Sequence, residues 1–215
     1  MAGRGGLDVT DREAETIADL VRGKLPLAAG VAAGVVLALI AALAAGWNSP
    51  RPGRPPDWEA PALSRRLTVA SNDTALALLG HRSTDFTFEV IAVPVTAPDS
   101  GFYGYGLAYR AQDPTHYCAF AVGGDGYYAV LRIEGSEEHP LVEWQQFPHI
   151  RRGRQSNRLR VTCARSSCDF SINDEYAATV EESKWLSGDV GLWARGFDEG
   201  ALMQFSSARL WTADD

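Results

Sequence analysis

Positive charge is scarce in this sequence, and its scarcity excludes one large class of function. The chain has 20 lysine and arginine residues against 27 aspartate and glutamate residues, so its formal net charge is −7. Nucleic-acid binding needs clustered basic side chains that neutralise phosphates. The one basic cluster is short, contains Arg151, Arg152 and Arg154, and is typical of a solvated loop. We therefore expect no nucleic-acid partner.

Residue patterns typical of catalysis or metal binding are also missing. The histidines do not occur at metal-ligand spacing, the three cysteines form no CxxC pair, and no Gly-x-Ser-x-Gly or phosphate-binding motif is present. Glycosidases need two carboxylates about 5–10 Å apart. Asp85 and Glu89 share a strand face but lie about 13 Å apart along it, and Glu181 and Glu182 point to opposite faces. We predict no catalytic residue, no cofactor and no metal site.

One stretch lacks charge altogether. Every residue from Leu25 to Trp47 is uncharged, and a helix of about 23 residues spans roughly 34 Å, enough to cross a hydrocarbon core of about 30 Å. This predicts a transmembrane helix over 25–47. A signal peptide cleaved near Ala42-Leu43-Ala44 is the alternative, although the run exceeds a usual signal-peptide core. Gly30 and Gly34 have the spacing that lets two such helices pack, so a homodimer through this segment is a further hypothesis.

The segments on either side of this run are polar. Residues 1–24 are interpreted as a cytoplasmic tail in which a capping box at Thr10–Glu13, followed by apolar residues at helical spacing, favours a short amphipathic helix over about 10–24. A weakly ordered tail is the alternative, because short isolated helices are marginal in water. Residues 48–66 are rich in proline and glycine and are interpreted as an extended linker that forms neither helix nor sheet.

Apolar and polar residues alternate through the rest of the chain, residues 67–213. Clear examples run over Phe86–Ala92, Tyr103–Tyr109 and Arg158–Cys163, with turn-forming residues such as Gly123–Gly126 between the strands. A period of two residues indicates half-buried strands, and no segment here shows a long helical period. The pattern predicts an all-β domain built as an antiparallel two-sheet sandwich.

Several motifs of this region resemble a known group of domains. They are YGLAYRAQDP at 105–114, HYCAFAV at 116–122, GDGYY at 124–128, NRLRV at 157–161 and SGDVGLW at 187–193. In this order they resemble the bacterial concanavalin A-like, laminin-G-like jelly rolls, including the domain grouped with 3-keto-disaccharide hydrolases. The resemblance covers roughly residues 80–213 and implies a jelly-roll sandwich. It implies little about function, because this fold carries enzymes, lectins and adhesion modules alike.

Two of the three cysteines are placed to form a disulfide. Cys163 and Cys168 flank a short loop between two strands, and facing residues of an antiparallel hairpin have Cα atoms about 4.5–5.5 Å apart, within reach of a disulfide. Two reduced cysteines are the alternative. Cys118 shares the phase of Phe120 and Val122, so we predict that it is a buried free thiol.

The disulfide also bears on membrane orientation. Basic residues flank both ends of the apolar run, so the positive-inside rule is close to a tie. A structural disulfide persists in an oxidising compartment. We therefore expect a single-pass protein of the cell membrane, inserted in the lipid bilayer, with its β domain outside the cytoplasm.

Aromatic side chains are the candidate ligand-binding residues, because a flat ring stacks on the apolar face of a sugar. The candidates are Tyr128, Trp144, Trp185 and Trp193. Alternation with Leu131 and Ile133 predicts that Tyr127 faces the core and Tyr128 faces outward. Most aromatic residues in a sandwich of this size are nevertheless core residues.

Three functions follow as hypotheses. The first is a noncatalytic extracytoplasmic module that binds glycan or cell-wall polysaccharide. The second is a protein-interaction or sensory ectodomain, and the third is a glycoside hydrolase, which rests on the resemblance alone. A concave groove lined by outward aromatics favours the first, a flat apolar patch the second, and two converging carboxylates with raised pKa the third.

Overall fold

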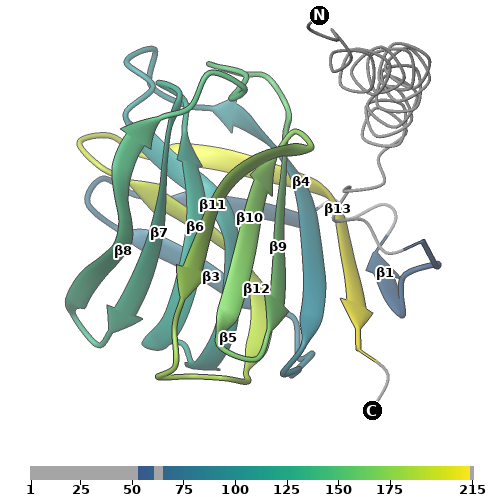
Figure 1. Ribbon diagram of the computed structural model, residues 1–215. Coiled ribbons are helices and arrows are strands. Elements are labelled where there is room, and N and C mark those ends of the chain that lie inside the picture. Colours follow the sequence, from purple (N-terminus) through teal and green to yellow (C-terminus); the bar gives the residue numbers. More distant parts are fainter. Residues whose placement is uncertain (1–52, 61–64, 214–215) are drawn as a thin grey trace, which may run out of the picture. The chain divides into compact units, whose positions relative to one another are not determined.

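The computed structural model describes residues 53–60 and 65–213, and this part of the chain is all-β (Figure 1). Within these residues there is no helix, and so none that is long and apolar enough to cross a membrane. The predicted amphipathic helix, the predicted transmembrane segment 25–47 and the pair Gly30 and Gly34 lie outside the described residues.

Two sheets pack face to face, which confirms the predicted sandwich. Sheet A contains, in spatial order, β1 (Trp58–Ala60), β13 (Ala201–Thr212), β4 (Phe86–Thr96), β9 (Asn157–Ala164), β10 (Ser167–Ile172) and β11 (Glu175–Glu181), and β2 (Arg65–Val69) also pairs with β13. Sheet B contains β3 (Thr74–Leu78), β12 (Asp189–Gly196), β5 (Tyr103–Asp113), β6 (His116–Gly123), β7 (Tyr127–Glu134) and β8 (Glu137–Gln146). All these pairings are antiparallel.

Alternating side chains fill the space between the sheets. In β5, Tyr105, Leu107 and Tyr109 are fully buried in this core, as their alternation with glycine and alanine predicted. Aromatic rings connect the two sheets, since Phe120 of β6 and Phe170 of β10 have ring centroids 4.9 Å apart. Burial of large apolar side chains from both sheets is the main source of stability here.

Strand β1 lies within the segment predicted to be a linker. Trp58–Ala60 pairs with Ala208–Leu210 of β13, and the Asp57 carboxylate accepts a hydrogen bond of 2.7 Å from the backbone N–H of Thr212. The prediction that no ladder forms between 48 and 66 is therefore wrong for these residues. No proline stands between Pro56 and Pro61, so the backbone N–H groups of residues 57–60 are free to enter a ladder.

The two cysteine predictions are confirmed. Cys163 of β9 and Cys168 of β10 face each other in the hairpin and form a disulfide with Cα atoms 4.1 Å apart. Cys118 is a buried free thiol, and burial raises its pKa to about 12. A thiol with so high a pKa is a poor nucleophile at neutral pH, because the thiolate is the reactive form.

Candidate functional site

The outer face of sheet B carries an apolar cluster of its own, separate from the core between the sheets. Trp193 of β12 is only 1% exposed there, and its indole N–H donates a hydrogen bond of 3.3 Å to the Tyr117 hydroxyl of β6. Small side chains on the central strands leave room for these two rings. The buried members of the cluster are Ala108, Ala111, Tyr117, Ala119, Ala121, Ala129, Leu131 and Trp193.

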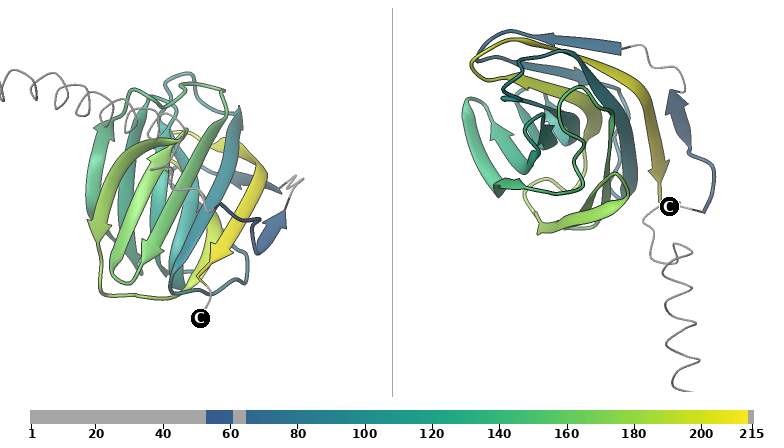
Figure 2. Two further views of the ribbon diagram at one scale, coloured as in Figure 1. Left: turned by 45° about the vertical axis from the view of Figure 1, so that its right-hand side comes forward. Right: turned by 90° about the horizontal axis from the view of Figure 1, so that it is seen from above.

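Sheet B curls so that this outer face is concave. Arg195 of β12 and Glu138 of β8 form an ion pair, although β5, β6 and β7 lie between their strands. Four strand spacings in a flat sheet measure about 19 Å, too far for these side chains, so the sheet must twist and curl. Figure 2 shows the curved strands from above. Arg195 and Glu138 also act on the Tyr117 hydroxyl, whose pKa is raised chiefly by burial. The floor of the concave face is thus filled by the protein's own side chains.

An aromatic row lies at one end of this face, where the strands meet loops. Phe197 follows β12, and its ring centroid lies 4.8 Å from that of Phe102, before β5, and 6.0 Å from that of Trp144 in β8. The Arg195 guanidinium lies 5.2 Å from the centroid of the Phe197 ring, an attractive cation–π contact. Phe102 is 48% exposed, and Phe197 and Trp144 are half-buried. We call Phe102, Phe197 and Trp144 the aromatic row.

The row adjoins Trp193 at Gly104, where β5 has no side chain. A Cβ atom at Gly104 would lie 3.0 Å from the Trp193 ring and 3.4 Å from the Trp144 ring. A glycine at this point of β5 therefore lets both indoles lie close to the backbone. The structure thus brings together two of the four predicted binding residues, Trp144 at the half-exposed row and Trp193 beneath it.

Tyr128 does not face outward, so the predicted phase of the pair Tyr127 and Tyr128 was wrong. Tyr128 is buried in the core, and its hydroxyl donates a hydrogen bond of 3.0 Å to the Ala177 carbonyl, whereas Tyr127 is half-buried. The phase was assigned by assuming that Leu131 faces the core. Leu131 instead belongs to the outer apolar cluster, so both faces of β7 are apolar and alternation alone cannot assign them.

Trp185 lies apart from the row, in the loop that joins β11 to β12. Its ring centroid is 6.2 Å from that of His116, at the start of β6, and Lys184 Nζ lies 5.7 Å from the centroid of the Trp185 ring. The aromatic row lies at the other end of sheet B, because Phe102 precedes β5 and His116 follows it. The structure therefore does not bring Trp185 to a common site with Trp144.

A hollow of about 440 Å³ lies beside the exposed edge of the row. Its lining comes from the loop before β5 and the loop after β12, and consists of Pro98, Ser100, Phe102, Asp198 and Glu199. An aromatic ring thus meets two exposed carboxylates and a hydroxyl at one place. Pockets that recognise small ligands combine apolar surface with a few polar groups in this way.

A second hollow, of about 540 Å³, is lined in part by the same loop before β5. Three loops build it: residues 97–101, the β6–β7 turn, and the loop that joins β8 to β9. Pro98 and Ser100 line both hollows. The charged residues of the second hollow are Asp99, Asp125, Arg152 and Arg154. The arginine-containing segment, predicted to be a solvated loop, is thus exposed but lines a concave surface.

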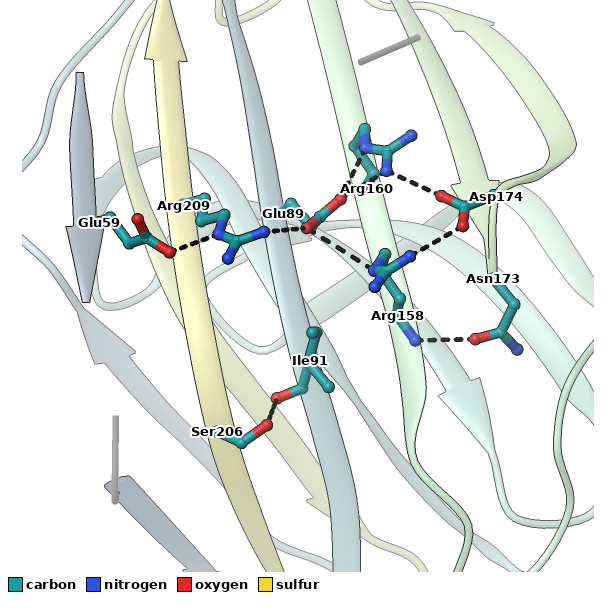
Figure 3. A network of polar contacts seen from close by, with 9 residues as sticks. All are labelled: Glu59, Glu89, Ile91, Arg158, Arg160, Asn173, Asp174, Ser206 and Arg209. Atoms are coloured by element: carbon teal, nitrogen blue, oxygen red, sulfur yellow. Dashed lines mark hydrogen bonds and ion pairs between the residues drawn. The ribbon is translucent and has the colours of Figure 1, made fainter. Parts of the chain in front are cut away.

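On the outer face of sheet A, acidic and basic side chains form a charged row in which they pair with one another (Figure 3). The Arg209 guanidinium donates a hydrogen bond of 2.6 Å to the Glu59 carboxylate, and Arg160 Nε donates one of 3.0 Å to the Glu89 carboxylate. Arg158 and Arg160 both reach Asp174, at 2.8 and 3.0 Å. Three acidic and three basic side chains pair with one another from β1 across β13, β4 and β9 to the β10–β11 turn, so we interpret this charged row as structural.

The described residues contain no group of three or more histidine, cysteine, aspartate or glutamate side chains placed to hold a metal ion. Among these residues, the carboxyl groups with a clearly shifted pKa are Asp57, Asp113, Glu134, Glu181 and Glu182, and in each the pKa is lowered. Hydrogen bonds from neighbouring donors lower these values. A general acid needs the opposite shift.

Sequence reasoning missed two members of the row and both hollows. Phe102 stands in a loop with proline, glycine and aspartate, and Phe197 stands in a loop with glycine and acidic residues. An aromatic residue inside such a loop has no sheet face to bury it, and this signal was present in the sequence. The meeting of the loops was not, because they are far apart along the chain.

No protein-family model matches this chain, and no curated protein matches it. Several solved structures do match. The carbohydrate binding module CBM66 from Bacillus subtilis has a TM-score of 0.56 at 16% identity, over 66% of this chain and 84% of that chain. A Bacillus subtilis protein of unknown function with a galectin-like fold has a TM-score of 0.51 at 10% identity, over 74% of this chain and 98% of that chain.

A third match is part of an enzyme. A mutant of the GH43 protein BlXynB from Bacillus licheniformis has a TM-score of 0.51 at 15% identity, over 68% of this chain but only 32% of that chain. At these identities the similarities establish the fold alone. They are consistent with the concanavalin A-like resemblance of the sequence motifs, and the described part of the chain is an antiparallel two-sheet β-sandwich.

Proposed function

We propose that this chain is a noncatalytic glycan-binding protein, and that the aromatic row with its adjoining hollow is the binding site. The observation that carries the proposal is Phe102, which is half exposed and packs against the Phe197 ring beside the carboxylates of Asp198 and Glu199. A sugar presents an apolar ring face and several hydroxyl groups. The aromatic rings can contact the apolar face of the sugar, and the carboxylates can accept hydrogen bonds from its hydroxyl groups.

The fold supports this proposal. Of the solved structures quoted above, the one with the highest TM-score is described as a carbohydrate binding module. That likeness is one of fold, so the site has to be argued from this chain's own residues. Because Trp193, Tyr117 and Leu131 fill the floor of the concave face, the sugar is placed at its rim, on the row, rather than along the strands.

The direction of the pKa shifts of the acidic groups favours a noncatalytic role. Glycoside hydrolysis uses a carboxylic acid whose pKa is raised, together with a second carboxylate across the scissile bond. The clear pKa shifts found in the described part of the chain are all downward for carboxyl groups, as in Glu134 and Glu182. Each of those groups is held ionised by nearby donors, which suits an ion pair rather than an acid catalyst.

We also propose that the sandwich is displayed outside the cytoplasm from a membrane anchor over residues 25–47. The Cys163–Cys168 disulfide supports an oxidising compartment, and the uncharged run is long enough to span a bilayer. A polysaccharide of the cell wall or the surroundings is then the ligand within reach. Self-association through Gly30 and Gly34 belongs to the same proposal.

A protein-interaction ectodomain is the second candidate, and the surface favours it less. The large apolar side chains most exposed in the described residues are Phe102, Tyr176 and Leu186. They lie before β5, in β11 and in the loop before β12. An interface would need a contiguous apolar patch of several hundred Å², and these three side chains do not form one.

Binding of the purified full-length chain to a polysaccharide array tests the proposal. We expect binding to at least one polysaccharide, and a loss of about fivefold to tenfold in affinity for Phe102→Ala, since one aromatic contact contributes about 1 kcal/mol. Tyr176→Ala is the matched control, an exposed aromatic away from the row, and should bind like the parent chain. Failure to bind any polysaccharide, or an equal loss in both variants, would refute the proposal.

A further inference from the structure

The second hollow has a firm floor. The backbone N–H of Gly153 donates to the Gly124 carbonyl at 3.0 Å, and the buried Tyr103 hydroxyl donates to the Gly153 carbonyl at 3.3 Å. These bonds tie the β8–β9 loop to the β6–β7 turn. The backbone that forms this floor is therefore held in place before a ligand arrives, which lowers the entropy lost on binding.

Two arginines, Arg152 and Arg154, border this hollow and have no side-chain hydrogen bond or ion pair within the part of the chain that the structure describes. By contrast, Arg158 and Arg160 next to them in sequence are paired. Arg152 lies against the turn, since a Cβ atom at Gly126 would be 2.6 Å from its Nε. Arginine binds carboxylate groups by paired hydrogen bonds.

Hydrogen-bond acceptors lie in the same hollow. Asp125 accepts the backbone N–H of Tyr127 through Oδ1 at 3.2 Å, which leaves Oδ2 available, and Asp99 also lines the hollow. The charges of Asp125 and Arg154 act on the Tyr103 hydroxyl in opposite directions, while burial raises its pKa. The hollow thus offers positive donors and negative acceptors over one floor.

This combination fits a sugar acid better than a neutral sugar. A uronic-acid residue presents one carboxylate and several hydroxyl groups on one ring. We propose that Arg152 and Arg154 bind the carboxylate of such a residue while Asp99 and Asp125 accept its hydroxyl groups. The ligand is then an acidic polysaccharide, and this inference rests on the proposed function.

The two hollows can be occupied by one chain of sugars. Pro98 and Ser100 line both of them, so only the loop 97–101 separates the aromatic row from the arginines. A neighbouring sugar of the same polysaccharide stacks on Phe102. The arginine hollow therefore decides which polysaccharide is chosen, and the row contributes affinity that is independent of charge.

Calorimetric titration of the full-length chain with oligogalacturonate and with its methyl ester tests this inference. The ester keeps the ring and the hydroxyl groups but removes the negative charge. We expect the acid to bind at least tenfold more tightly than the ester, and Arg152→Gln and Arg154→Gln each to reduce the affinity for the acid by about tenfold. Added salt should weaken the binding of the acid and leave that of the ester unchanged.

Arg165→Gln is the matched control, because it removes the same charge from an exposed arginine in the β9–β10 turn, outside the hollow. It should bind the acid like the parent chain. Equal affinity for acid and ester, or an equal loss in the control, would overturn the inference and leave the proposed function standing. Absence of binding to either probe, with binding to neutral glycans on the array, would also overturn the inference alone. Absence of binding to every glycan would overturn both.

Discussion

At the scale of single residues, the most consequential group away from the site is Glu89. It is 3% exposed and lies between Arg160, which is 1% exposed, and the more exposed Arg158 and Arg209 (Figure 3). Removing this buried carboxylate leaves the buried Arg160 guanidinium with Asp174, an exposed carboxylate, as its acidic partner in the described part of the chain. Glu59, at the exposed end of the same row, bonds only to Arg209 among the described residues, so its loss leaves no buried charge.

We expect Glu89→Gln to lower the free energy of unfolding by about 2–4 kcal/mol, because breaking a buried ion pair is strongly destabilising. Glu59→Gln should lower it by less than about 1 kcal/mol, as for a surface ion pair. Urea denaturation of both variants beside the parent chain measures the difference. Equal effects would show that burial does not govern this row.

At the scale of elements, the β9–β10 hairpin shows how a local pattern specifies a covalent contact. Cys163 and Cys168 occupy facing positions in the ladder, and Arg165 in the turn between them has a φ of 54°. A disulfide across so short a loop restricts the unfolded chain only modestly. The hairpin also pairs with β4 and β11 on its two sides, so the sheet does not depend on the disulfide.

Reduction of the Cys163–Cys168 disulfide should therefore weaken the fold without abolishing it. We expect a loss of about 2 kcal/mol in the free energy of unfolding, measured by urea denaturation with and without a reductant. The double variant Cys163→Ser with Cys168→Ser should show the same loss and no response to the reductant. Complete unfolding on reduction would contradict this account of the hairpin.

At the scale of the whole molecule, the segment before the sandwich is fastened to its last strand. Beside the β1 ladder, the indole N–H of Trp211 donates to the Arg54 carbonyl at 3.0 Å, and the backbone N–H of Thr212 donates to Asp57. That backbone hydrogen bond is the main cause of the lowered pKa of Asp57. A lowered pKa in the folded state means that the contact stabilises at neutral pH and is lost as the pH falls through the acidic range.

A fragment of residues 65–215, which lacks β1, should consequently melt at a lower temperature than a fragment of residues 50–215. Loss of β1 and of the contacts to Thr212 should amount to about 2 kcal/mol, or roughly 5 °C for a domain of this size. Circular dichroism on heating measures both midpoints, and the longer fragment should keep that of the sandwich in the full-length chain. Identical midpoints for the two fragments would show that β1 contributes nothing.

Much of the fold could be predicted from the sequence, and less of the candidate site. The strands around Phe88, Leu107 and Val161 follow from alternation, because large apolar side chains alternate in each with small or polar ones. Alternation failed at Tyr128, where both faces of β7 are apolar. It also failed at Trp58, where a proline-rich composition hid a short edge strand.

The sequence by itself determined an antiparallel two-sheet sandwich and the pairing of Cys163 with Cys168, since both depend on which face a side chain takes within a short stretch of strand. Only the tertiary structure decided that Trp193 is covered and that Phe102, Phe197 and Trp144 meet. Those three side chains come from loop and strand ends widely separated along the chain. They meet because sheet B curls, and the curl is the sum of twists and packing over six strands, which no local pattern specifies.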